Sequence, residues 1–205
     1  MLKKFCALIF ATFFLSVAVS SVYAAEYKEG VNYKIVAPTA TKNKEIREFF
    51  SFWCGHCYSL QPMFERIEEH FKGTASFERN PVSLLGGRMG AESQRGLAIS
   101  QLLKIEDLYV EALFKQMHVD NKIPASHDDF IKLFESLGVP SQTFESEYNS
   151  FPVMGQISTW DKLTDAYKLD AVPEVVINGK YLTIMESVDT EAEFIDLIDY
   201  LLKLD

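Results

Sequence analysis

The chain has 205 residues, of which 48% are hydrophobic, and a formal net charge of −9. A chain of this length and apolar content can bury its own core, as one domain or as a domain with an insertion. The acidic balance argues against a nucleic-acid-binding protein, because phosphate recognition needs a basic patch.

Residues 1–24 have the pattern of a secretory signal peptide. Two lysines form a basic start, the run from Phe5 to Val22 is uncharged and mostly apolar, and small residues at Val22 and Ala24 fit a cleavage site. An uncleaved membrane anchor is the alternative, but serines within the run and the cleavage site favour removal. Loss of the two lysines changes the net charge from −9 to −11. We therefore expect a soluble mature chain outside the cytosol, where disulfides persist.

The segment after the signal peptide, residues 25–85, predicts the first part of a sheet domain. Tyr33 to Val36 has the pattern of a short strand, and Glu45 to Trp53, dense in aromatic residues, is the strongest strand candidate. Apolar residues then recur at helical spacing from Cys57 to Phe71, and Ala75 to Val82 predicts another strand. This order predicts a parallel βαβ core.

Residues 86–169 contain no convincing strand and predict an inserted all-helical domain. The expected helices are Ala91 to Leu103, Ile105 to Met117, Ser126 to Leu137, Ser141 to Phe151, and Val153 to Tyr167. Ser126 before two aspartates, with Gly138 after the last turn, marks one of these helices clearly.

Residues 170–205 complete the sheet domain, so the fold class is α/β with a helical insertion. Glu174 to Ile177 and Tyr181 to Ile184 predict a hairpin, because the Asn178-Gly179 dipeptide between them favours a tight type I′ turn. Thr190 with Glu193 forms a capping box that opens a last helix, Glu191 to Leu202.

Cys54 and Cys57 are the two cysteines that remain once Cys6 leaves with the signal peptide. A C-x-x-C pair between a strand and a helix has the spacing of a redox dithiol, because the first helical turn brings positions i and i+3 together. The free N–H groups and dipole of the helix start favour a thiolate at Cys54. His56 adds a donor and, when protonated, a positive charge.

Two other interpretations of the cysteine pair are weaker. A structural zinc site would need two further ligands from His70, His118 or His127, and none of these forms a second close pair. A structural disulfide that closes so short a loop would constrain little chain entropy. A catalytic dithiol explains the spacing, the histidine and the strand-to-helix context together, so we expect a redox-active disulfide, no metal and no cofactor.

The sequence from Glu48 to Cys57, EFFSFWCGHC, resembles the DsbA family of bacterial periplasmic thiol:disulfide oxidoreductases. The helical insertion and Val172-Pro173 before a strand share this resemblance, which covers nearly all of the mature chain in the same order. It implies a thioredoxin fold with an inserted helical domain and a periplasmic location. It also implies oxidation of newly secreted, unfolded proteins and re-oxidation by a membrane partner of the DsbB type.

The resemblance also assigns roles to residues around the dithiol. Cys54 would form the mixed disulfide with substrate, Cys57 would resolve it, and His56 would stabilise the Cys54 thiolate. Val172 and Pro173 match the cis-proline loop that faces the cysteines and holds the substrate backbone. The alternative for Pro173 is an ordinary proline at the start of a strand.

Three further residues complete the expected site, and a fourth is the candidate partner of one of them. Phe52 and Trp53 would offer unfolded peptide an apolar landing surface beside the Pro173 loop. Glu48 matches the buried acid that handles protons beneath the cysteine pair in the family, with a position at the strand end in solvent as the alternative. Arg79 stands where many relatives carry a lysine partner for this acid, and arginine does not release its proton as lysine can.

Gly55-His56 departs from the Pro-His of well-known DsbA proteins and matches protein disulfide isomerase, which predicts a milder oxidant. A reductase or isomerase of the same compartment is therefore an alternative function. Isomerases usually dimerise through an additional domain for which this chain has no length, so we expect a monomer. A chaperone-like binding module with a structural disulfide is an alternative from a different class.

Overall fold

A computed structural model of the chain describes residues 27–204. The expected signal peptide, residues 1–24, lies outside the described residues. Within residues 27–204, no helix is both long enough and apolar enough to cross a membrane.

A mixed five-stranded sheet forms the centre of the fold, in the order β1-β5-β4-β2-β3. Its strands are β1 (Tyr33–Ile35), β2 (Glu45–Phe50), β3 (Ser76–Pro81), β4 (Glu174–Ile177) and β5 (Tyr181–Thr183). Strand β2 pairs parallel with β3 and antiparallel with β4, so it is a central strand. The predicted βαβ core is confirmed.

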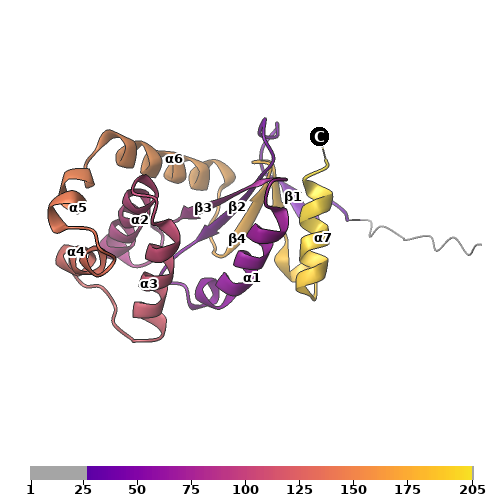
Figure 1. The fold of residues 1–205 in the computed structure, drawn as a ribbon. Coiled ribbons are helices and arrows are strands. Elements are labelled where there is room, and N and C mark those ends of the chain that lie inside the picture. The colour runs from indigo at the N-terminus through magenta and orange to yellow at the C-terminus, as the bar shows by residue number, and fades with distance from the viewer. Residues whose placement is uncertain (1–26, 205) are drawn as a thin grey trace, which may run out of the picture.

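Helices α1 (Gly55–Phe71) and α7 (Glu191–Leu201) cover one face of this sheet (Figure 1). Ile46 of β2 packs there in one buried cluster with Ile67 of α1 and Leu197 of α7. On the opposite face Phe49 packs with Val176 and Leu169. The alternation of side chains along β2 therefore buries the strand on both faces, as expected for a central strand.

Five helices lie between β3 and β4 in the chain and gather beside the sheet (Figure 1). They are α2 (Gly87–Leu102), α3 (Glu106–His118), α4 (His127–Ser136), α5 (Ser141–Glu147) and α6 (Phe151–Tyr167), and a short 3₁₀ turn, η1 (Met185–Ser187), precedes α7. An aromatic core that includes Tyr109, Phe130 and Trp160 joins the helices and continues into Phe50 and Phe52. The predicted helical insertion is confirmed.

Local sequence signals correctly predicted the starts of two helices and one hairpin turn. Asp129 accepts the backbone N–H of Ser126 at 3.0 Å at the start of α4, and Thr190 accepts the N–H of Glu193 at 3.2 Å at the start of α7. The hairpin turn has positive φ at both Asn178 (51°) and Gly179 (61°), which is the requirement of a type I′ turn.

Other ends differ from the prediction. Strand β2 ends at Phe50 rather than at Trp53, because the chain turns there and the N–H of Cys54 donates to the carbonyl of Ser51 at 3.0 Å. Helix α2 begins at Gly87, four residues before the expected start at Ala91. Gly86, with a left-handed φ of 80°, precedes it and sets the turn into the helix.

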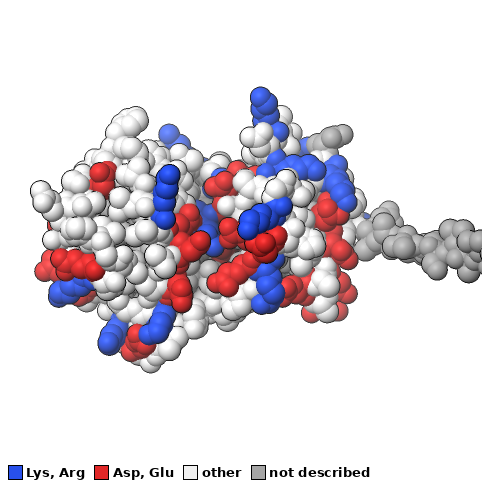
Figure 2. All heavy atoms as spheres, viewed as in Figure 1, with Lys and Arg blue, Asp and Glu red and all other residues white. Residues whose placement is uncertain are grey.

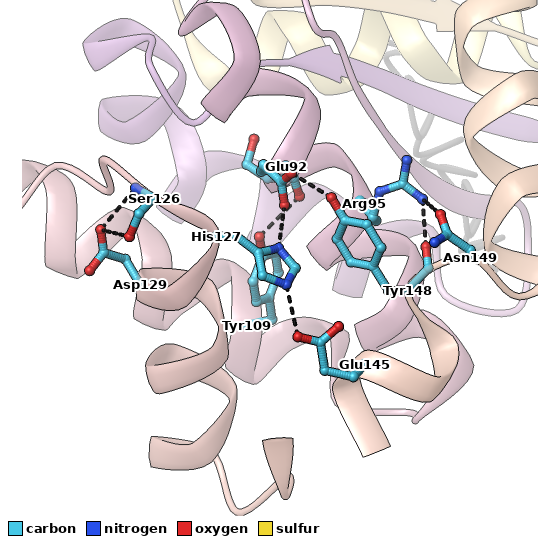
Figure 3. A network of polar contacts seen from close by, with 10 residues as sticks. Glu92, Arg95, Tyr109, Ser126, His127, Asp129, Glu145, Tyr148 and Asn149 are labelled. Atoms are coloured by element: carbon cyan, nitrogen blue, oxygen red, sulfur yellow. Dashed lines mark hydrogen bonds and ion pairs between the residues drawn. The ribbon is translucent and has the colours of Figure 1, made fainter. Parts of the chain in front are cut away.

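A polar network joins three helices of the insertion (Figure 3). His127 at the start of α4 contacts Glu92 of α2 through Nδ1 and Glu145 of α5 through Nε2, each at 3.1 Å. Glu92 also accepts the hydroxyl of Tyr148, and the Arg95 guanidinium lies 4.3 Å from the centre of the Tyr148 ring. The two carboxylates thus flank one imidazole.

Candidate active site

Cys54 is the N-cap residue of α1, directly after the turn that follows β2. Its sulfur accepts the backbone N–H of Cys57 at 3.2 Å, and its S–H donates to the carbonyl of Val172 at 3.6 Å. The thiol is half-buried, and both cysteines are free thiols in this structure. The geometry therefore combines an accessible sulfur with a donor and the positive end of a helix dipole.

Cys57 lies one helical turn further on and is fully buried. Burial, followed by the hydrogen bond with Cys54, raises the pKa of the Cys57 thiol far above its ordinary value. The pair is therefore asymmetric, because an external disulfide or thiol can reach Cys54 but not Cys57.

His56 is exposed in the first turn of α1. It lines a groove of about 380 Å³ together with Leu60, Val172 and Pro173. The groove therefore begins beside the dithiol, with the imidazole on its rim.

The Val172–Pro173 peptide bond is cis, as the resemblance implied. Strand β4 begins at Glu174, so Pro173 immediately precedes it. Because the Val172 carbonyl accepts from Cys54, this loop faces the reactive sulfur directly.

The expected role of Phe52 as a landing surface for peptide is wrong for its side chain, which has no exposed area. Its ring packs 4.8 Å from Phe114 and 5.6 Å from Tyr109 between ring centres. The turn after Phe50 directs the Phe52 side chain into the aromatic core of the helical region. Its packing there stabilises the active-site turn.

Trp53 is half-buried beside Gly86. A Cβ atom on Gly86 would lie 2.4 Å from the Trp53 ring, so glycine is needed for this close approach. The two residues before Gly86, Leu84 and Leu85, expose 54% and 41% of their surface. The exposed apolar surface beside Trp53 therefore comes from the loop of Leu84 and Leu85, for which the sequence pattern predicted no role.

Glu48 is fully buried, which excludes the alternative position in solvent. The amide of Gln61 donates to its Oε1 at 3.1 Å, while Oε2 has no hydrogen-bond partner among the described residues. Burial raises the pKa of Glu48 to about 8, although the charge of Arg79 and the Gln61 hydrogen bond lower it in part. A pKa raised in this way favours the protonated form of the carboxyl group at neutral pH.

Arg79 lies opposite Glu48 in the β2–β3 register. Its ion pairs within 4.0 Å are with Glu68 and Asp107 at 3.0 Å and with Glu106 at 3.6 Å. Arg79 thus binds a group of acids on α1 and α3, and it acts on Glu48 through its charge.

Gln61 is a site residue that sequence reasoning missed. Its amide donates both to Glu48 and to the carbonyl of Cys57, at 3.1 and 3.3 Å. The i+4 spacing from Cys57 places it on the same side of α1, and that spacing is the signal that could have identified it.

A larger hollow of about 890 Å³ lies between α1 and α3. Figure 2 shows acidic side chains gathered around this junction, and the lining includes Glu65, Glu68, Asp107 and Glu111. Gln61 also lines it, so the side chain that donates to the buried carboxyl group of Glu48 borders the hollow.

The histidines considered as zinc ligands have other contacts. His127 contacts Glu92 and Glu145, His118 contacts the carbonyl of Phe52, and the His70 ring packs against Phe71. Residues 27–204 contain no group of three or more side chains placed to hold a metal ion.

Comparison with known proteins matches this architecture and site to one family. The model of the DSBA-like thioredoxin domain matches residues 45–196. The thiol:disulfide interchange protein DsbA of Pseudomonas aeruginosa is 31% identical over 177 residues, which is 86% of this chain and 83% of the relative. DsbA of Escherichia coli K12 is 25% identical over 190 residues, covering 88% of this chain and 91% of the relative.

Solved structures agree with these relatives. The crystal structure of DsbA from Klebsiella pneumoniae has a TM-score of 0.80 at 25% identity and covers 88% of this chain and 100% of that one. A Proteus mirabilis DsbA variant, solved with the peptide PWATCDS bound non-covalently, also has a TM-score of 0.80, at 26% identity and the same coverage. Together with the half-buried and buried thiols of its C-x-x-C pair, these matches show that the chain belongs to the DsbA family of thiol:disulfide oxidoreductases.

Proposed function

We propose that this oxidoreductase acts as an oxidase, which introduces disulfide bonds into newly secreted proteins in the periplasm. The observation that carries the proposal is the setting of Cys54, whose sulfur accepts a backbone N–H at the start of α1. This donor and the helix dipole stabilise negative charge on the sulfur in the reduced protein. A protein that stabilises its reduced form transfers its disulfide readily.

The exchange begins with the Cys54–Cys57 disulfide. A substrate thiolate attacks the Cys54 sulfur, the bond between the two cysteines breaks, and Cys57 leaves with the electron pair. A second substrate thiolate then attacks the substrate sulfur of the mixed disulfide and releases Cys54 as a thiolate. Two electrons pass from the substrate dithiol to the cysteine pair, and the substrate gains one disulfide.

Charged and titratable neighbours assist these steps. His56, on the groove rim, stabilises the Cys54 thiolate that leaves in the second step. The raised pKa of Glu48 favours its protonated form at neutral pH, and this carboxyl group supplies the proton that Cys57 takes up on reduction. The raised pKa of Cys57 supports this role, because a buried thiol with such a pKa must be protonated after it leaves.

The substrate lies as an extended peptide across the Val172–Pro173 loop. The Val172 carbonyl, now 3.6 Å from the Cys54 sulfur, is placed to accept a backbone N–H of that peptide. Trp53 and the exposed Leu84 and Leu85 offer apolar surface to its side chains. The peptide-bound Proteus mirabilis relative supports a peptide substrate. A DsbB-type membrane oxidase would then restore the disulfide.

Two assays test the proposal. The oxidised protein is expected to oxidise a reduced two-cysteine peptide at pH 7, with a reduction potential above about −230 mV, the lower end for glutaredoxins. The reduced form is also expected to melt at a higher temperature than the oxidised form. A higher melting temperature for the oxidised form, with rapid reduction of insulin, would identify a reductase. Peptide binding without any exchange would identify a chaperone-like module.

A further inference from the structure

His118, the last residue of α3, makes a contact outside its own helix that reaches the active-site turn. Its Nε2 lies 2.8 Å from the carbonyl oxygen of Phe52, two residues before Cys54. A carbonyl oxygen can only accept a hydrogen bond, so Nε2 carries a proton and donates it to this contact. The helical region thereby holds the backbone on the strand side of the dithiol.

The same imidazole also holds the other side of the dithiol. It stacks on the ring of Tyr58, the residue after Cys57, with the ring centres 4.9 Å apart and the planes at 7°. The N–H of Tyr58 in turn donates to the carbonyl of Cys54 at 3.1 Å. One side chain therefore contacts both segments that flank the C-x-x-C sequence.

Packing around His118 makes this contact well defined. Phe114, one turn earlier on α3, lies 4.8 Å from Phe52 and 5.8 Å from Tyr58 between ring centres. Figure 1 shows α3 beside the first turns of α1, so the inserted helices reach the active site through this helix. Since Phe52 is fully buried, its carbonyl group is held against His118 and away from bulk solvent.

We propose that His118 is a positioning residue, which holds the active-site turn and thereby makes the protein a stronger oxidant. The proposal rests on dithiol–disulfide exchange at Cys54 and Cys57. In the disulfide state the sulfur–sulfur bond itself restrains the turn. In the dithiol state only non-covalent contacts restrain the turn. The structure has both cysteines as free thiols, and the His118 contact is present in it. Loss of the contact therefore destabilises the dithiol state more than the disulfide state.

The experiment measures the equilibrium constant for reduction of the protein by glutathione, and His118→Phe is the main variant. The constant is expected to fall about fivefold, the effect of one hydrogen bond of typical strength. His118→Gln keeps an N–H donor and is expected to stay within about twofold of the unchanged protein, because it loses the aromatic stack only. His70→Phe, at an exposed position of α1, is the matched control and is expected to change nothing.

The possible results distinguish a positioning role of His118 from a general contribution to the stability of the fold. An unchanged constant in folded His118→Phe overturns the proposal, as does an equal shift in His118→Gln. Lower melting temperatures in both redox forms without a shift in the constant also overturn it. Tyr58→Leu removes the same stacked ring and does not depend on the folding of His118→Phe. It is expected to lower the constant about twofold, and no change there overturns the proposal. Failure of the unchanged protein to exchange with glutathione would instead refute the proposed function.

Discussion

The amide of Gln61 donates to the buried carboxyl group of Glu48 at 3.1 Å, and the same amide donates to the carbonyl of Cys57. Gln61 also lines the hollow between α1 and α3. Through Gln61 the buried carboxyl group of Glu48 is therefore connected both to the backbone of Cys57 and to this hollow.

The first prediction concerns Glu48→Gln and the free energy of unfolding. The pKa of Glu48 is raised from 4.5 to about 8 in the folded protein, so the folded state keeps a proton that the unfolded state loses in this range. The stabilising contribution is complete below pH 4.5 and is lost as pH rises through about 8. The total loss is on the order of a few kcal/mol. Urea unfolding from pH 4 to 9 should show this decline in the unchanged protein and a flatter curve in the variant.

Two further variants serve as controls for this pH dependence. Glu65→Gln removes an exposed carboxylate from α1, the helix that carries Gln61, and should keep the decline. Gln61→Leu should extend it to higher pH, because the Gln61 hydrogen bond lowers the pKa of Glu48. Parallel curves for the unchanged protein and Glu48→Gln would contradict the shifted pKa.

A second prediction tests the division of labour between the cysteines. Cys57→Ala should accumulate mixed disulfides with secreted proteins, because the half-exposed Cys54 still reacts and no buried partner resolves the adduct. Cys54→Ala should accumulate almost none, since Cys57 is fully buried. Non-reducing gels measure both, and equal amounts of adduct would refute the assignment.

A third prediction uses two adjacent glycines with positive φ. Alanine at Gly86 (φ 80°) or at Gly87 (φ 54°) should cost about 1–2 kcal/mol through backbone strain. Gly86→Ala should cost about 1–3 kcal/mol more, because its Cβ would overlap the Trp53 ring, whereas the Cβ at Gly87 meets open space. Urea unfolding of both variants gives the difference. Equal losses would mean that Trp53 moves aside without cost.

The fourth prediction concerns His127, between Glu92 and Glu145. Burial tends to lower the pKa of His127, but the hydrogen bonds and negative charges of the two glutamates outweigh it, so the pKa is raised above 6.5. The stabilisation is complete below pH 6.5 and is lost as pH rises through the folded pKa. It should amount to less than about 1 kcal/mol, because solvent screens the partly exposed pairs.

Thermal melts of His127→Gln between pH 5 and 8.5 measure this contribution. The unchanged protein should lose its advantage over the variant as pH rises. His70→Gln, at an exposed site at the end of α1, should follow the unchanged protein throughout. A constant difference between His127→Gln and the unchanged protein at all pH values would assign His127 a packing role only.

Much of the fold followed from local signals in the sequence. The Asn178-Gly179 turn, the helix start at Ser126, the capping box at Thr190 and the glycine after α4 all lie where the pattern predicted them. These features depend on the φ angles and hydrogen bonds of a few neighbouring residues, which residue type largely controls. The succession of helices in the insertion was predictable from the sequence for the same reason.

The C-x-x-C pair was enough to predict dithiol redox chemistry, because a pair at a helix start needs only the geometry of one helical turn. Which side chains surround that pair depends on the tertiary structure. It buried Phe52 instead of exposing it, gave Arg79 three acids on α1 and α3, and placed His118 against a backbone 66 residues away. Such contacts join segments that are distant in the chain, so they depend on how α3 packs beside the active-site turn, and no local pattern of residues encodes them.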